Sequence, residues 1–242
     1  MSGRARGALR DVARGLLDLL YPPACIACAR VLPAQGFFCE RCDLAVERTP
    51  PSHCARCAEP GDFGAGSCPR CTRSPPAFAR AWAPLAHAGP VARAVQRFKY
   101  EDHPELAPLL AQLLAQEAAS FLATAPALVV ALPLHERRFR ERRYDQAALL
   151  ASELARATGR TLRLDLLRRT RATRRQVGLS EAGRAENVEG AFEAAGRLQG
   201  EAVLLVDDVF TTGATARAAT AALRSAGAGE VQVLTLARAF SL

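Results

Sequence analysis

The sequence has no apolar stretch of the roughly 20 residues that a membrane-spanning helix requires, so membrane insertion is not expected. Residues 8–21 (ALRDVARGLLDLLY) contain Arg and Asp and lack a small-residue cleavage site, which excludes a signal peptide. The apolar residues of this segment recur at helical spacing and predict an amphipathic leading helix, within residues 1–22, that docks on the rest of the protein. We therefore expect a cytoplasmic protein.

Aromatic residues are scarce, at 6%, although 50% of the residues are hydrophobic. This composition is typical of a globular protein and excludes a disordered chain. Lysine is almost missing, because Lys99 is the single Lys among 32 basic residues, and this indicates that position 99 resists replacement. Arg presents a fixed fork to phosphate. The arginine clusters at 137–143 and 168–175 therefore suit a polyphosphate ligand or a nucleic-acid backbone, although such runs are usually solvated faces.

No cysteine lies outside residues 25–71, where eight of them form four CxxC knuckles. Each cysteine of the first two knuckles recurs 29 residues later, so each half reads CxxC-x10-CxxC and one unit is used twice. The knuckles are Cys25 with Cys28, Cys39 with Cys42, Cys54 with Cys57, and Cys68 with Cys71.

This spacing predicts a double zinc ribbon over residues 23–74 that holds two structural Zn²⁺ ions. A CxxC turn presents two thiolates, and two turns complete a tetrahedral site. Disulfides fit poorly with paired CxxC spacing in a cytoplasmic chain. The repeat favours sequential pairing of the knuckles, and a crossed arrangement stays open. His53 is interpreted as a loop residue rather than a spare ligand. Eight thiolates and two Zn²⁺ would lower the formal charge of +8 to about +4, so basicity alone argues only modestly for nucleic acid.

After Pro75 and Pro76 the pattern changes to apolar strands alternating with Ala- and Leu-rich helices, which predicts an α/β domain over residues 77–242. We expect a mostly parallel sheet with flanking helices, and ligands at the carboxyl ends of its strands. Strands are predicted at 80–87, 127–133, 161–167, 202–206 and 230–236, and helices at 90–98, 105–122, 145–158 and 213–225.

The segment with the clearest chemistry is VLLVDDVFTTGAT, residues 203–215. A buried strand leads through two acids, Asp207 and Asp208, into a Thr/Gly turn that opens a helix. Backbone N–H groups at a helix N-terminus favour a phosphate, and glycine allows a close approach. The segment resembles the phosphoribosyl-pyrophosphate (PRPP) fingerprint of type I phosphoribosyltransferases. The resemblance implies that Asp207 and Asp208 hold the ribose hydroxyls. It also implies a lead-in of Val209 and Phe210, and a 5′-phosphate loop of Thr211, Thr212, Gly213, Ala214 and Thr215.

Two basic segments accompany this loop. ALPLHERRFRERRYDQA, residues 131–147, follows another predicted strand, where the phosphoribosyltransferase fold holds its pyrophosphate loop. Arg137 or Arg138 would bind pyrophosphate, with Mg²⁺ bridging it to the ribose; the alternative is a solvated basic helix start. Residues 167–193 form a long polar stretch before the PRPP strand, and such a stretch suits a hood over the ligand.

Taken together, the chain resembles the ComF/GntX family, a zinc-ribbon module followed by a phosphoribosyltransferase domain. The likeness covers nearly the whole chain and includes FKY at 98–100, LPLH at 132–135, RRTRATRRQVGLS at 168–180, RAEN at 184–187 and GAF at 190–192. Where the family typically has RGFNQ, this chain has RRYDQ, with Arg143 for Gly and Asp145 for Asn. If that Gly needs a positive φ, the turn would differ here. Asp145 would also repel a pyrophosphate beside it.

Two functions follow from the resemblance. The first is transfer of ribose 5-phosphate from PRPP to an unidentified acceptor, with Asp207, Asp208 and Lys99 as catalytic residues and pyrophosphate as the leaving group. The second is a non-catalytic PRPP sensor that handles single-stranded DNA, or a partner protein, during DNA uptake in competence. Against DNA binding, the zinc module has few aromatic residues that could stack on bases.

Overall fold

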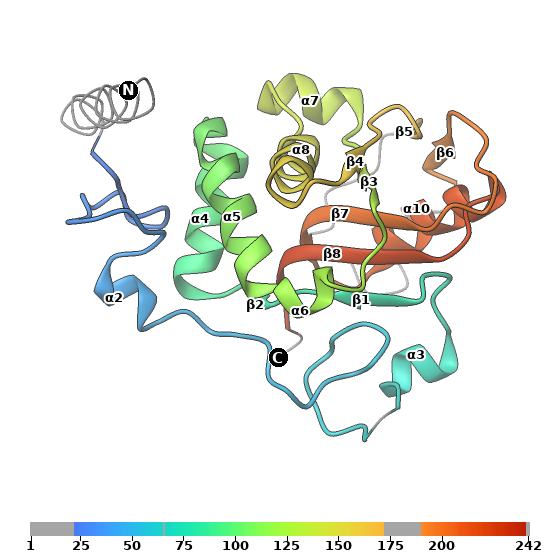
Figure 1. Ribbon diagram of the computed structural model, residues 1–242, viewed down its shortest axis with the longest axis horizontal. Coiled ribbons are helices and arrows are strands. Elements are labelled where there is room, and N and C mark those ends of the chain that lie inside the picture. Colours follow the sequence, from blue (N-terminus) through green and yellow to red (C-terminus); the bar gives the residue numbers. More distant parts are fainter. Residues whose placement is uncertain (1–21, 65, 172–189, 241–242) are drawn as a thin grey trace, which may run out of the picture.

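The computed structural model describes residues 22–64, 66–171 and 190–240 (Figure 1). The predicted leading helix and most of the predicted hood lie outside these residues. The centre of the molecule is a parallel sheet whose strands follow the order β1-β8-β7-β3-β4. These strands are β1 (Arg80–Trp82), β8 (Val231–Arg238), β7 (Val203–Phe210), β3 (Leu128–Ala131) and β4 (Thr161–Leu162). The predicted α/β class is therefore confirmed.

The strand predicted at 80–87 lies at the edge of the sheet and is interrupted in its middle. Its second part, β2 (Leu85–Ala86), pairs with β8 in the same direction as β1. The gap contains Pro84, which has no N–H to give to a ladder. The segment between the two halves of the cysteine module contacts this gap, because Thr49 N–H donates to the Pro84 carbonyl at 2.8 Å.

The two faces of the sheet bury different sets of side chains, because neighbouring strand residues point in opposite directions. Leu204 and Val206 of β7 belong to a core that includes α4 (Gly89–Tyr100), α5 (Ala107–Glu117) and α8 (Gln146–Thr158). Val203 and Leu205 face a second core under α10 (Ala214–Ser225). Figure 1 shows α4, α5 and α8 together on one side of the sheet.

Each half of the cysteine module packs on a different core. Ile26 of the first half is fully buried with α4, α5 and α8. All four cysteines of the second half are buried in the core on the α10 side, beside Phe78 and Ala81. A short helix starts after the third cysteine of each half, α2 (Glu40–Asp43) and α3 (Pro69–Arg73). The two halves of the module therefore pack against opposite faces of the sheet.

Two further predicted elements are divided in the structure. The helix expected at 105–122 is η1 (Pro104–Leu106), α5 and α6 (Ala119–Leu122), and the chain bends at Ala118, whose φ is −104°. The strand expected at 161–167 is wrong beyond Leu162. Arg163 and Asp165 pair at 2.7 Å in an exposed turn. The chain then enters β5 (Leu167–Arg169), which pairs antiparallel with β6 (Phe192–Ala194) in a separate small sheet.

The strand predicted at 202–206 continues to Phe210, so the two acids stand within β7 rather than after it. β7 pairs with β8 as far as Phe210 and Arg238, whereas its pairing with β3 ends at Val206. From Asp207 onward, the β3 side of β7 is therefore left without a neighbouring strand among the described residues. In the same part of the chain, no helix combines the length and the apolar character that a membrane crossing needs.

Candidate functional site

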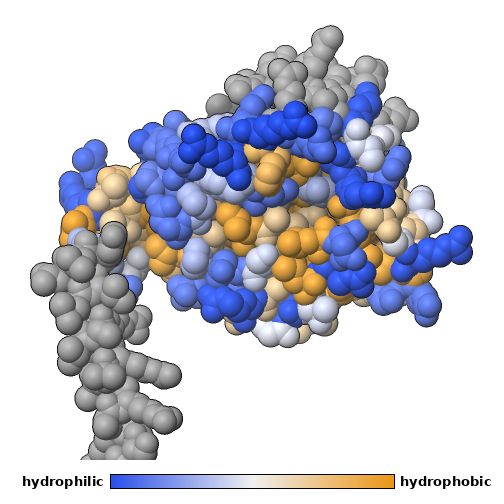
Figure 2. All heavy atoms as spheres, turned by 90° about the horizontal axis from the view of Figure 1, so that it is seen from above, coloured by the Kyte–Doolittle hydropathy of each residue, from blue (hydrophilic) through white to orange (hydrophobic). Residues whose placement is uncertain are grey.

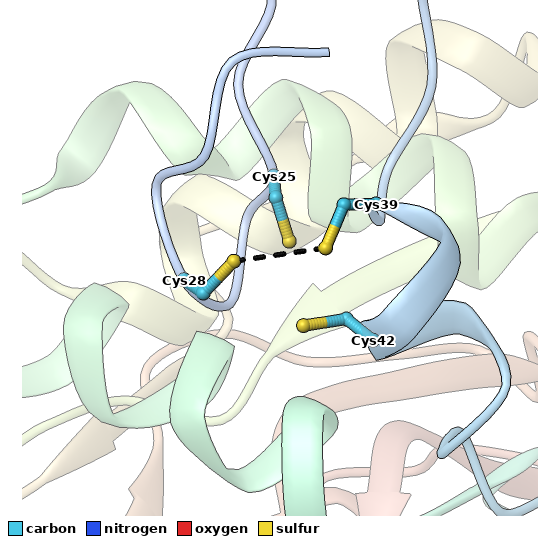
Figure 3. A group of neighbouring side chains, drawn as sticks. All are labelled: Cys25, Cys28, Cys39 and Cys42. Atoms are coloured by element: carbon cyan, nitrogen blue, oxygen red, sulfur yellow. Dashed lines mark hydrogen bonds between the residues drawn. The ribbon is translucent and has the colours of Figure 1, made fainter.

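The four cysteines of the first half turn their sulfurs toward one point (Figure 3). The Sγ atoms of Cys25, Cys28, Cys39 and Cys42 all lie within 4.8 Å of one another, and those of Cys28 and Cys39 are 3.7 Å apart. A Zn–S bond of about 2.3 Å in a tetrahedron places two sulfurs about 3.8 Å apart. Four thiolates are a donor set typical of structural zinc, so the cluster fits one Zn²⁺ ion.

The second half repeats this arrangement with Cys54, Cys57, Cys68 and Cys71, and the Sγ atoms of Cys57 and Cys68 are 3.8 Å apart. The knuckles therefore pair sequentially, and the crossed arrangement is excluded. His53 stands outside the cluster. Its Nδ1 lies 2.9 Å from the Pro50 carbonyl, and its ring packs on Trp82.

The backbone around the first knuckle of each half repeats as well. The residues that follow these CxxC turns, Ala29 and Ala58, both have positive φ, at 60° and 57°. Each donates its N–H to the carbonyl of the first cysteine of its knuckle at 2.9 Å, Ala29 to Cys25 and Ala58 to Cys54. Alanine accepts this strained conformation at the same place twice, which indicates that the knuckle geometry imposes it.

A cavity of about 690 Å³ opens at the carboxyl ends of the strands, where β7 extends past β3. Its walls come from α4, α7 (Glu136–Arg142), the end of β7 and the loop into α10. The predicted site residues that line it are Lys99, Arg138, Asp207, Asp208, Val209, Phe210, Thr211, Gly213 and Thr215. Two other loop residues, Thr212 and Ala214, are not among the lining residues of the described chain. The side chain of Arg137 lies outside the described part of α7.

The acids form the floor of this cavity with the single lysine. Lys99 Nζ lies 2.7 Å from Asp208 Oδ1, and both side chains are largely shielded from water. Asp207 accepts a 2.8 Å hydrogen bond from the Asp208 N–H. Burial, and secondarily the charge of Asp208, raise the pKa of Asp207 to about 8. A carboxyl held in this way can accept hydroxyl hydrogen bonds once it loses its proton.

The loop at the start of α10 depends on Gly213. Its φ is +79°, and a Cβ added there would lie 2.5 Å from the Phe210 ring. Phe210 is itself buried and contacts Phe78 edge to face, at 6.2 Å between ring centroids. The loop therefore lies directly on an aromatic ring, with no room for a side chain at its turn.

Arg143 keeps the turn that the family glycine implies. It has φ +66° directly after α7, and its N–H donates to the Phe139 carbonyl at 2.7 Å. The expectation that Arg143 would change this turn is therefore wrong, because arginine adopts the strained conformation. An exposed ion pair with Asp102, at 3.3 Å, accompanies it.

Asp145 does not line the cavity wall where a pyrophosphate would meet it. Its Oδ1 accepts the Ala148 N–H at 3.0 Å and caps α8, and its Oδ2 accepts the Leu134 N–H at 2.9 Å. Burial raises the pKa of Asp145. Asp145 therefore links the segment after β3 to the start of α8. This is a structural role, which the aspartate performs where the family typically has asparagine.

Several lining residues were not predicted as parts of the site, and two of them, His87 and Arg169, have shifted pKa values. His87 follows β2, and burial and the charge of Lys99 lower its pKa. Arg169 ends β5 and stacks on Phe192 at 5.1 Å, and burial lowers its pKa to about 10. The position of His87 at a strand's carboxyl end was a usable signal. The sequence gives no such signal for Arg169, because this residue lies in a run of arginines.

Comparison with known proteins matches two family models to this chain. Residues 16–72 match a double zinc ribbon domain, and residues 145–241 match a phosphoribosyl transferase domain. The chain is 32% identical over 226 residues to the DNA utilization protein YhgH of Escherichia coli K12, covering 91% of this chain and 99% of that protein. It is 30% identical over 223 residues to Competence protein F of Haemophilus influenzae, covering 89% and 96%. Among solved structures, the UMP synthase of Leishmania donovani matches with a TM-score of 0.34 and 21% identity, over 63% of this chain and 25% of that one, a likeness that carries no argument.

Proposed function

We propose, since the chain belongs to the ComF/GntX family of double-zinc-ribbon proteins with a phosphoribosyltransferase domain, that it binds PRPP and transfers its ribose 5-phosphate to a nucleophilic acceptor. The observation that carries the proposal is the shared cavity. It brings two adjacent acids, the single lysine and a glycine turn at a helix N-terminus to one strand end. A sugar phosphate needs hydrogen-bond acceptors for its hydroxyls and cations or N–H donors for its phosphates, and the cavity holds both kinds of group.

The 5′-phosphate would bind at the start of α10. Backbone N–H groups and the helix dipole favour an anion there, and the Thr211 and Thr215 hydroxyls can donate to it. The ribose hydroxyls would donate to Asp207 and Asp208. Arg138 and Lys99 line the rest of the cavity, where the pyrophosphate of PRPP would extend.

In the reaction, the bond between the anomeric carbon and pyrophosphate breaks, and a bond from the acceptor forms at that carbon. The acceptor loses its proton, and pyrophosphate leaves with the electron pair. Positive charge develops on the sugar, and the two carboxylates beside it would stabilise that charge. Mg²⁺, when bound with PRPP, would neutralise part of the pyrophosphate charge.

The first test is calorimetric titration of PRPP into the zinc-loaded protein, with and without Mg²⁺. We expect Mg²⁺-dependent binding that the Asp207→Asn/Asp208→Asn variant loses. Asp165→Asn is the matched control, because Asp165 is an exposed acid that pairs with Arg163 and does not line the cavity. A folded wild-type protein that does not bind PRPP would rule out the proposal. Binding would justify an acceptor screen by pyrophosphate release.

A second candidate function is the handling of single-stranded DNA, and one feature favours it. Two exposed aromatic residues, Tyr100 at 63% and Phe139 at 49%, lie among the arginines of α7. The Arg142 guanidinium stacks over the Tyr100 ring at 4.8 Å, which joins the end of α4 to α7. Figure 2 looks onto the side of the molecule that carries α7, where hydrophilic side chains surround hydrophobic patches. Exposed rings between cationic groups suit stacked bases and their phosphates. The names of the relatives, which refer to DNA utilization and competence, agree with it.

Fluorescence anisotropy with a labelled oligothymidine tests this candidate. We expect affinity to fall steeply with salt, and to fall about tenfold or more in Tyr100→Ala/Phe139→Ala, since stacking contributes about 1–3 kcal/mol per base. Leu164→Ala is the matched control, because Leu164 is also 49% exposed and lies outside α7. Equal affinity of the double variant and the control would exclude this surface.

A further inference from the structure

We propose that Arg238 is a positioning residue through which the second ribbon, at Cys57 and Glu59, holds the phosphate loop in shape. Arg238 is the last residue of β8 and is 1% exposed, which is unusual for an arginine. It lies beside Phe210 on the neighbouring strand. The residue is absent from the cavity lining, so any effect on a ligand must act through other groups.

On one side, the Arg238 guanidinium binds the second ribbon through a hydrogen bond and an ion pair. Its Nη1 donates to the Cys57 carbonyl at 2.6 Å, and its Nη2 pairs with the Glu59 carboxylate. Glu59 also pairs with Arg70 at 3.0 Å, so the carboxylate links Arg238 to α3. Cys57 belongs to the second four-cysteine cluster, and a metal there would fix the carbonyl that Arg238 contacts.

On the other side, Arg238 supports the phosphate loop. Its guanidinium carbon lies 4.9 Å from the centroid of the Phe210 ring, in a cation–π contact. The same ring also lies against the turn at Gly213, where even a methyl group would collide with it. A shift of Arg238 would release the ring, and the loop that rests on the ring would lose its support.

The contacts therefore form an unbroken series: Cys57 and Glu59, Arg238, Phe210 and Gly213. Physical contact alone permits coupling, and a change in loop behaviour on removing the middle member would demonstrate it. The inference rests on the proposed PRPP binding for its ligand readout only. The order of the loop itself can be measured without ligand.

The test compares Arg238→Met with Arg160→Met in zinc-loaded protein. Arg160 is the matched control, because it also binds backbone carbonyls, those of Leu122 and Pro126, at a part of the fold remote from the loop. Hydrogen exchange of the amides of residues 211–215 is measured in both variants, with α5 amides as an internal reference. PRPP affinity and zinc content are measured in parallel.

We expect Arg238→Met to keep two zinc ions, to speed exchange of the loop amides by about tenfold relative to α5, and to weaken PRPP binding by about tenfold. Arg160→Met should leave both unchanged. If Arg238→Met does not fold, Glu59→Gln should shift loop exchange in the same direction, because it weakens the grip on the guanidinium. Loop exchange equal to wild type in a folded variant would overturn the inference. A wild-type protein that fails to bind PRPP would remove the proposed function, while the exchange result would still decide this inference.

Discussion

At the scale of single residues, the most consequential group is Asp207, because its protonation state is set by its surroundings. Burial and the neighbouring Asp208 carboxylate raise its pKa to about 8, and Lys99 opposes this shift only partly. We therefore expect the free protein to hold a proton at Asp207 at neutral pH. A sugar hydroxyl that donates to this group favours its deprotonated form, so ligand binding should expel the proton.

We predict that PRPP binding releases up to one proton at pH about 7.5, and that affinity rises with pH by up to about tenfold per unit until the pKa of Asp207 is passed. The measurement is calorimetry in two buffers of different ionisation enthalpy. His87→Gln is the control, because the pKa of His87 is lowered and its ring is already neutral at that pH. Affinity that falls with rising pH would contradict the assignment.

Arg143 is the second informative residue, since it adopts a conformation that glycine adopts freely. A left-handed conformation costs a non-glycine residue about 1–2 kcal/mol, and the flexibility of glycine in the unfolded chain returns about 0.5–1 kcal/mol of that. We predict that Arg143→Gly raises the free energy of unfolding by about 0.5–1 kcal/mol in urea titrations. Arg140→Gly, within α7, should lower it by about 1 kcal/mol. Equal losses in both variants would mean that φ at residue 143 is not a source of strain.

At the scale of elements, the conformation of the loop between β7 and α10 depends on how closely it packs on β7. Gly213 combines a positive φ with a Phe210 ring where a Cβ would stand, whereas Gly159 after α8 has a similar φ and open space around it. Substituting alanine at Gly159 therefore measures backbone strain alone, whereas the same change at Gly213 measures strain and steric collision together.

We predict that Gly159→Ala lowers the free energy of unfolding by about 1–2 kcal/mol, which is the strain alone. Gly213→Ala should cost more, because the ring must also move, and should weaken PRPP binding by at least about tenfold. Adding Phe210→Leu should recover part of the stability of Gly213→Ala, since it relieves the collision but not the strain. Calorimetry and urea titration of the three variants test this. Equal costs at the two glycines would mean that the ring yields freely.

At the scale of the whole molecule, the cysteine module is part of the core rather than an appendage. The second four-cysteine cluster is buried with Phe78, Val203 and Val233, and the first half places Ile26 under α4 and α5. Two arginines of the sheet domain bind module carbonyls. Arg97 donates to Ile26 at 2.9 Å, and Arg238 donates to Cys57 at 2.6 Å. Loss of metal should therefore affect the sheet as well as the ribbons.

We predict that stripping the zinc lowers the thermal midpoint of the sheet by at least about 10 °C, because metal binding supplies folding free energy to surfaces that the sheet shares. Circular dichroism before and after chelation measures the change, and adding Zn²⁺ back should restore the original midpoint. A sheet that melts at the same temperature without metal would show that the module folds independently of it.

Much of this architecture was readable from local sequence. The offset of 29 between the cysteine pairs predicted two equivalent clusters, because a CxxC turn fixes two ligands without help from the rest of the chain. Apolar runs, such as that at residues 127–133, predicted the buried parallel strands. The pattern of acids, threonines and Gly213 predicted a tight turn between β7 and α10, and Gly213 has the positive φ that such a turn requires. These features depend on neighbours in sequence.

Other features depend on residues far apart in the chain, and only the tertiary structure decided them. The extension of β7 through Asp207 depends on its pairing with β8, and the division of 161–167 depends on a partner strand about 25 residues away. The raised pKa of Asp207 comes from burial that no local pattern reports. Arg238 looked like one more arginine near the end of the sequence. Its position between a cysteine knuckle and the loop before α10 exists only because β8 places it beside Phe210 and the second ribbon folds back over its side chain.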